Sequence, residues 1–270
     1  MADALDSALA KVGRAEEHFG RLQKDVRRWR EKRSDEMARD NNPERTEFRF
    51  YTQWNEPADP VGWALLMGDG VHNLRSALDH AVYECSGPKP PERCEFPIFR
   101  AKDRYLLPDT NERGGLYKIR GIKNDVVRAL IQGAQPWQRR EGPEHHMLWM
   151  LHELDIQDKH RLITPVALVP KAMRADLTVE FFGRGVTGQI HVSGKGRIPL
   201  EDHALVMTVT TPEPAKRVEM NAALTLAVGF RVAGIDVGIT GLLSELCQYV
   251  RGLVEQIRDA VVEAEAPPSA

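Results

Sequence analysis

Cysteine is scarce in this sequence, and its scarcity excludes two classes of small protein. The 270 residues include three cysteines, and no two of them form a Cys-x-x-Cys pair. A disulfide-stapled scaffold and a cysteine-rich zinc module are therefore excluded. Because an odd number of cysteines fits reduced thiols, we expect a cytoplasmic protein.

Long hydrophobic runs and a strong net charge are also missing. The longest mostly apolar stretch, residues 222–243, contains Arg231 and Asp236, so we expect no membrane partner. The first 33 residues are charged throughout and lack the apolar core of a signal peptide. The 37 Lys and Arg residues nearly balance 39 Asp and Glu residues, and the net charge of −2 gives no global field that attracts nucleic acid. No Walker or dinucleotide-binding fingerprint is present, so we expect no dinucleotide and no cofactor.

Helical periodicity is what the sequence does have at both ends. Apolar residues recur at alternating steps of three and four from Leu5 to Trp29, and again from Leu243 to Ala260. This spacing predicts a long helix with a heptad seam at each end. The first helix is basic and the end of the last is acidic, which favours antiparallel pairing of the two. Seams of this kind are also typical of oligomers, and we expect a homodimer.

The middle of the chain predicts an α+β fold. Three further helices are expected at about residues 61–85, 123–132 and 144–162. A short strand is expected at residues 45–53, and β-rich segments separated by Gly or Pro follow Pro165, at residues 177–182, 188–192, 204–211 and 217–230. We therefore predict a helical bundle with an inserted antiparallel β-sheet of about four strands. The expected parts are a bundle of residues 1–165 plus 237–264, a β subdomain of residues 166–236, and a disordered tail of residues 265–270.

Histidines gather on two of the predicted helices. Six of the nine lie within residues 72–80 and 145–160. On a helical wheel, the apolar residues of the 61–85 helix occupy one arc, and short polar side chains occupy the other. A solvated face normally carries Lys, Glu and Gln, so this polar arc favours a cleft or a buried hydrogen-bond network. The polar arc consists of Asp69, His72, Asn73, Ser76, Asp79, His80 and Tyr83, with Arg75 at its border, one turn before Asp79.

The 144–162 helix has a second polar stripe. His152, Asp155 and Lys159 share one face of a helix that is otherwise apolar nearly all round. An aspartate in such a setting needs polar partners from another element. If the two stripes face each other, one polar cluster forms in the bundle from Asp69, His72, Asp79, His80, His152, Asp155 and Lys159.

Residues 75–80, Arg-Ser-Ala-Leu-Asp-His, form an Arg-x4-His pattern beside Leu74 and Tyr83. This pattern resembles the signature of the HEPN superfamily, many of whose members are metal-independent ribonucleases built on a helical bundle and active as dimers. The resemblance implies RNA as a partner and a catalytic group of Arg75, His80, Ser76 and Asp79. A histidine can take the proton from a ribose 2′-hydroxyl, and an arginine can stabilise the charge gained at phosphorus. The same stretch also looks like bacterial proteins of unknown function.

Two other interpretations of the polar residues stay open. Asp69-x-x-His72 has the spacing that puts two metal ligands on one helix face, and His80, His152 or Asp155 would complete a set similar to that of DinB-type bundles. The other interpretation is a non-catalytic binding or assembly module in which the His/Asp cluster is a structural network.

Overall fold

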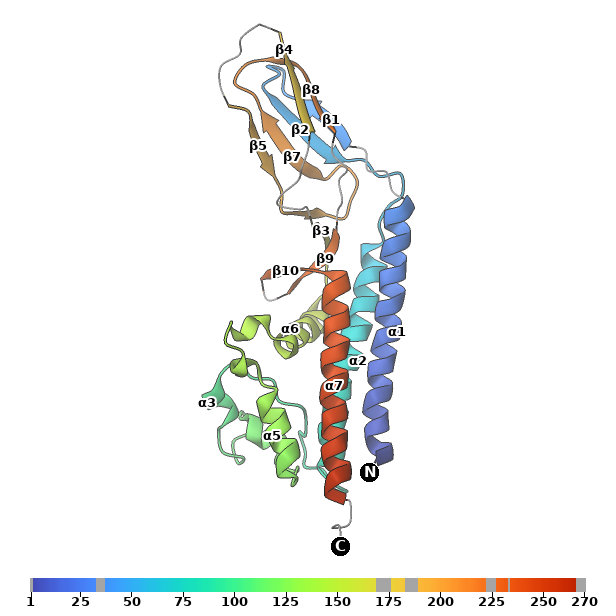
Figure 1. Ribbon diagram of the computed structural model, residues 1–270, viewed down its shortest axis with the longest axis vertical. Coiled ribbons are helices and arrows are strands. Elements are labelled where there is room, and N and C mark those ends of the chain that lie inside the picture. Colours follow the sequence, from blue (N-terminus) through green and yellow to red (C-terminus); the bar gives the residue numbers. More distant parts are fainter. Residues whose placement is uncertain are drawn as a thin grey trace.

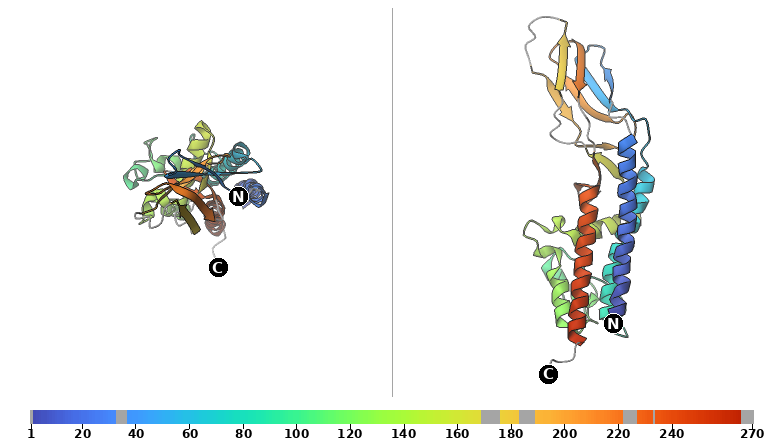
Figure 2. Two further views of the ribbon diagram at one scale, coloured as in Figure 1. Left: turned by 90° about the horizontal axis from the view of Figure 1, so that it is seen from above. Right: turned by 45° about the vertical axis from the view of Figure 1, so that its right-hand side comes forward.

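The computed structural model describes residues 2–32, 37–168, 176–182, 189–221, 227–232 and 234–265 of an elongated molecule. Three long helices, α1 (Ala2–Lys32), α2 (Pro60–Cys85) and α7 (Ile239–Glu265), run along its long axis (Figure 1). The β-strands lie at one end, and α1 begins and α7 ends at the other. Figure 2 shows the same arrangement from two further directions. The predicted α+β class is confirmed.

The remaining elements lie on one side and at one end of this frame. Short helices lie beside α7, and strands alternate with turns at the far end. In chain order they are β1 (Met37–Asn41), β2 (Glu47–Thr52), α3 (Lys102–Tyr105), α4 (Gly115–Lys118), α5 (Asp125–Gly133), η1 (Pro136–Gln138), η2 (Pro143–His145), α6 (Met147–His160), β3 (Pro165–Leu168), β4 (Asp176–Phe181), β5 (His191–Gly194), β6 (Arg197–Pro199), β7 (Leu205–Thr210), β8 (Ala215–Asn221), β9 (Ala227–Val232) and β10 (Ile235–Gly238).

The heptad seam of α1 is buried inside the chain. Every residue of the seam from Leu5 to Trp29 is at most 5% exposed. The seam packs against α2 and α7, and α2 runs antiparallel to α1 (Figure 1). Gly70 of α2 lies so close to Phe19 of α1 that an added Cβ would stand 2.1 Å from the phenylalanine ring. The seam that predicted an oligomer therefore forms the core of one chain.

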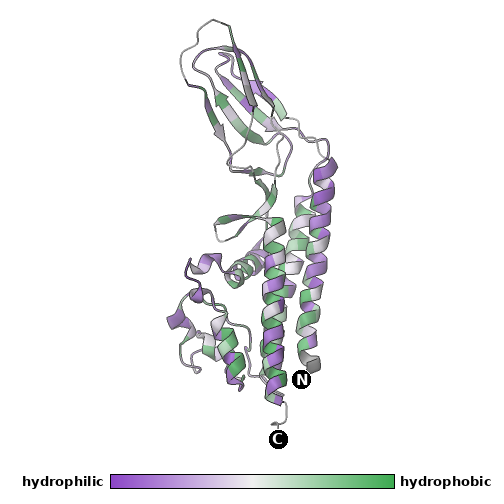
Figure 3. Cartoon of the chain, in the orientation of Figure 1, coloured by the Kyte–Doolittle hydropathy of each residue, from purple (hydrophilic) through white to green (hydrophobic). Residues whose placement is uncertain are grey.

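The terminal helices pair antiparallel as predicted, but not through the expected charges. In the ion pair between them, α7 supplies the cation and α1 the anion: Arg251 of α7 donates to Glu16 of α1 at 2.8 and 3.1 Å. The acidic end of α7, around Glu263, lies beside the start of α1, whereas the basic residues of α1 gather near its other end. That end is hydrophilic in Figure 3. The basic and acidic stretches therefore do not neutralise each other.

Within the described residues, the strands form three antiparallel sheets. One has the order β1-β2-β7-β5, a second β10-β9-β3-β6, and the third is the β4-β8 pair. The segment predicted as one strand over residues 217–230 is divided between β8 and β9, which belong to different sheets. Because β2 pairs with β7, the sheets use residues 37–52 in addition to the predicted β subdomain. Of the predicted tail, Glu265 ends α7 and residues 266–270 lie outside the described part.

Two hydrophobic cores follow from this arrangement. The larger one fills the bundle and continues to the β3, β6 and β9 strands. A separate small core at the far end holds Phe48 and Phe50 of β2 against Met207 and Val209 of β7. None of the helices in the described residues is long and apolar enough to cross a membrane.

Candidate functional site

The polar arc of α2 is divided among three neighbours. Arg75 and Asp79 contact the segment around Phe96, whereas His80 and Asp69 face α1. His72 lies toward α6. Positions on a helix that differ by five residues stand about 140° apart, so Arg75 and His80 of the Arg-x4-His pattern are directed at different elements.

Arg75 and Asp79 clamp the chain at Phe96. Arg75 Nη2 donates to the carbonyl oxygen of Phe96 at 2.8 Å and pairs with Asp79 Oδ1 at 2.8 Å. The same carboxylate oxygen accepts the backbone N–H of Phe96 at 2.8 Å. The Arg75 side chain is 10% exposed and the Asp79 side chain 32%, so the guanidinium of the clamp is largely closed to solvent. Burial raises the pKa of Asp79, against the lowering effects of Arg75 and of the Phe96 N–H.

One polar atom of this clamp has no partner in the described part of the chain. Arg75 Nη1 is buried without a hydrogen-bond acceptor there. Because an unsatisfied buried donor is costly, an acceptor placed beside this atom would form a strongly stabilising hydrogen bond. The positive charge of Arg75 helps to lower the pKa of the neighbouring His152.

The other two residues of the implied catalytic group lie apart from the clamp or beside it. His80 Nδ1 is 3.1 Å from Ser7 Oγ of α1. Ser76 is half-buried on α2. Asp69 stands 3.8 Å from His18 Nδ1, also on α1. Within one chain, the residues that the HEPN resemblance implies are therefore not gathered around one point.

The predicted approach of the two stripes occurs at Asp155. This residue of α6 has a side chain that is only 4% exposed, and its Oδ2 accepts from Lys159 Nζ at 2.6 Å. On the α2 side, His72 Nδ1 is 3.7 Å from Asp155 Oδ1. The His72 side chain is 64% exposed, so it closes the outer edge of the cluster. The facing stripes thus bring His72, Asp155 and Lys159 together.

His152 lies on the same side of α6 and is half-buried. Burial, helped by the positive charge of Arg75, lowers the pKa of His152 to about 4. The imidazole is therefore neutral at pH 7. A neutral ring beside a buried guanidinium fits a structural contact, since a protonated ring there would add a second positive charge.

Two members of the cluster had no sequence signal. Lys118 of α4 forms an ion pair with Glu95, and its Nζ lies 5.8 Å from the centre of the Phe99 ring. Burial alone would raise the pKa of Glu95, but the Lys118 ammonium outweighs it and the pKa falls below its usual value. Both residues come from residues 87–122, a stretch of the sequence in which no periodicity marks a side chain. Only the fold brings them to α2.

The metal interpretation requires Asp69 and His72 to converge with His80, His152 or Asp155. His72 does approach Asp155, but Asp69 lies against His18 and His80 against Ser7. Across the described ranges, no group of three or more His, Cys, Asp or Glu side chains is arranged to hold a metal ion.

Fold and cluster together define an α+β protein whose central helix carries a half-buried polar network. No known family model, no curated protein and no solved structure matches the chain.

Proposed function

We propose that this protein is a non-catalytic binding module in which the Arg75 cluster is a structural network. The observation that carries the proposal is the closed clamp of Arg75, Asp79 and Phe96. Ribonuclease chemistry needs an arginine that reaches a phosphate and a histidine that reaches the same nucleotide. Here the guanidinium is largely covered and His80 contacts the opposite helix.

The clamp explains how three elements hold together. Arg75 and Asp79 fix the segment at Phe96 to α2, and His72 of the same helix lies 3.7 Å from Asp155 of α6. Phe96 itself is fully buried in the main core. Breaking one partner of a buried pair leaves the other charge unpaired, which costs about 3–5 kcal/mol in closed sites and less in half-open ones. The network therefore supports the core below it.

The test compares melting with RNA cleavage in Arg75→Ala and His80→Ala. We expect Arg75→Ala to lower the melting temperature by about 5 °C or more, because a loss of about 2 kcal/mol corresponds to such a shift. His80→Ala loses one half-exposed hydrogen bond and should shift it by about 2 °C or less. Wild-type protein should leave single-stranded and hairpin RNA intact in EDTA.

The ribonuclease interpretation makes the opposite prediction. RNA cleavage that persists in EDTA and disappears in both variants, while each keeps the wild-type melting temperature, would overturn the binding module. Arg75→Lys is the matched control, because it keeps the charge but not the forked geometry. A structural clamp should lose stability in Arg75→Lys as well, though less than in Arg75→Ala.

A further inference from the structure

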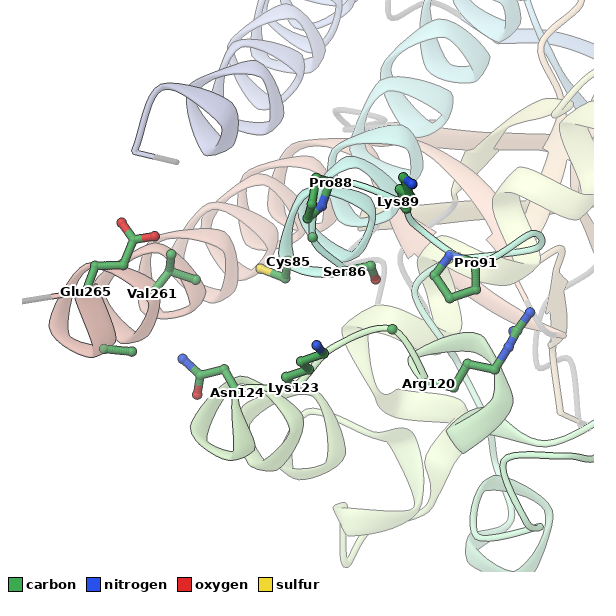
Figure 4. A pocket seen from close by; sticks show the side chains of 13 residues that line it. Cys85, Ser86, Pro88, Lys89, Pro91, Arg120, Lys123, Asn124, Val261 and Glu265 are labelled. Carbon is green, nitrogen blue, oxygen red and sulfur yellow. The ribbon is translucent and has the colours of Figure 1, made fainter.

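A cavity of about 550 Å³ lies away from the polar cluster, at the end of the bundle where α7 ends (Figure 4). Three segments enclose it: the C-terminal end of α2 with residues 86–91, residues 120–124 before α5, and the last turn of α7. This volume is in the range of small-molecule sites. The residues that line the cavity do not include any member of the Arg75 network.

One wall of the cavity is apolar. It is formed by Cys85, Pro88, Pro91, Val261 and Ala264. Burial raises the pKa of the Cys85 thiol to about 11, so the sulfur is protonated at neutral pH and contributes an apolar surface.

Two polar residues of the wall use their polar groups inside the protein. Ser86 Oγ donates to the carbonyl oxygen of Val82 at 2.8 Å. Asn124 Oδ1 caps α5 by accepting the N–H groups of Val126 and Val127 at 2.9 and 3.2 Å, and its Nδ2 donates to the carbonyl oxygen of Ala260. A ligand in the cavity therefore meets these residues mainly as packed surface.

The charged groups at the cavity are mostly positive. Lys89, Arg120 and Lys123 line it together with one carboxylate, Glu265. Arg120 is held by the carbonyl oxygens of Tyr117 and Glu92 at 2.6 and 2.7 Å, with its guanidinium 3.6 Å from the centre of the Tyr117 ring. No carboxylate within the described residues lies within 4.0 Å of any of these three cations. The formal charge of the lining is thus +2.

Helix ends change this charge without reversing it. α2 and α7 end at the cavity, and each C-terminus carries roughly half a negative elementary charge. The N-terminus of α5 contributes roughly half a positive charge. About one and a half positive charges remain. The cavity therefore stays positively charged after the two helix ends are counted.

We infer that this cavity binds a small amphipathic anion, with an apolar body against the α2–α7 wall and an anionic head group at Lys89 and Lys123. The two observations that carry this inference are an apolar wall with satisfied polar groups and cations without carboxylate partners. It rests on the binding-module function, to which it gives a ligand class. If the cavity binds no such anion, the conclusions on the Arg75 clamp and on RNA cleavage are unaffected.

The probe is 8-anilinonaphthalene-1-sulfonate, an aromatic anion that fluoresces when it leaves water. The full-length protein should bind about one probe molecule, and octanoate should displace it. Octyltrimethylammonium, with an alkyl chain of similar length and the opposite charge, should displace it at least about tenfold less well, since like charges repel. Equal displacement by the cation, or no saturable binding, would overturn the proposal.

Variants locate the bound probe. Lys123→Gln should weaken binding about two- to fivefold, the range for one exposed charge, and Glu265→Gln should strengthen it. Ala264→Trp fills the cavity from the exposed last turn of α7 and should abolish binding. Lys24→Gln, an exposed cation of α1, is the matched control and should have no effect. Unchanged affinity in both Lys123→Gln and Ala264→Trp, at wild-type melting temperatures, would place the probe elsewhere and reject the site.

Discussion

At the scale of single residues, burial fixes the charge of two histidines on the α6 side of the bundle. His146 caps α6 by accepting the N–H of Leu148 at 3.1 Å, and its other ring nitrogen lies 3.3 Å from the Tyr249 hydroxyl. Burial lowers the pKa of His146 to about 4, as it does for His152. Both rings are therefore neutral in the folded protein at pH 7.

These two rings predict a loss of stability in mild acid. The unfolded chain binds protons at its histidines near pH 6.5, but the folded protein does not protonate His146 or His152 until about pH 4. Because the unfolded state then binds more protons, stability falls as the pH drops from about 6.5 to 4. Melting temperatures measured across this range should decrease steadily.

The variant His152→Gln isolates one of the two contributions. We expect its melting temperature to fall less steeply with pH than that of the wild type, although it is lower at pH 7. His191→Gln replaces an exposed ring of β5 and should retain the wild-type slope. Equal slopes in His152→Gln and the wild type would show that His152 titrates normally.

Sequence spacing captured the local contacts of the candidate site and missed the distant ones. Arg75 and Asp79 are one helical turn apart, and so are Asp155 and Lys159, so their pairing follows from the helix itself. The Glu95–Lys118 pair joins an extended segment to a four-residue helix, and no local pattern encodes it. Residues that are close only through tertiary packing leave no periodic signal.

At the scale of elements, the contact of α1 with α2 depends on the absence of a side chain at Gly70. We expect Gly70→Ala to destabilise the protein by about 1–3 kcal/mol, because the new Cβ would collide with the Phe19 ring. Gly20→Ala is the matched control, since a Cβ there has open space around it. It should instead stabilise by about 0.5–1 kcal/mol through helix propensity. Denaturant unfolding of the two variants measures both values, and stabilisation by both would contradict the close contact.

The long helices show why seams do not determine the number of chains. A three-four repeat requires an apolar partner, but it does not state whether the partner belongs to the same chain. Here α2 and α7 supply it, and the α1 seam is at most 5% exposed. The homodimer stays a prediction that sedimentation of the purified protein can test.

At the scale of the whole molecule, the two hydrophobic cores predict two levels of stability. The small core around Phe48 and Val209 joins β2 to β7 and is separate from the core of the bundle. Within the larger core, the ring centroids of Trp29 and Trp54 lie 5.1 Å apart, and Asp202 accepts the backbone N–H of Trp54 at 2.9 Å. Regions with few buried contacts open more often than large cores.

Hydrogen exchange can measure this difference. In Phe48→Ala, amides of β2 and β7 should exchange faster, while those of α2 and α7 keep their wild-type protection. Leu74→Ala, which opens a cavity in the bundle and costs about 2–5 kcal/mol, should reduce protection in α2 and α7. Uniform loss of protection along the chain in Phe48→Ala would show that both ends unfold as one unit.

The sequence by itself determined the long helices, the α+β class and the existence of two polar stripes, because periodicity and Pro breakers act within one element. Tertiary structure alone decided which neighbour each polar residue meets. It turned His80 toward Ser7 and closed Arg75 against Phe96, and it brought Lys118 to Glu95. It also created the cavity at Lys123, where three segments distant in sequence meet. Such contacts depend on how helices are placed against one another, which the spacing within each helix does not encode.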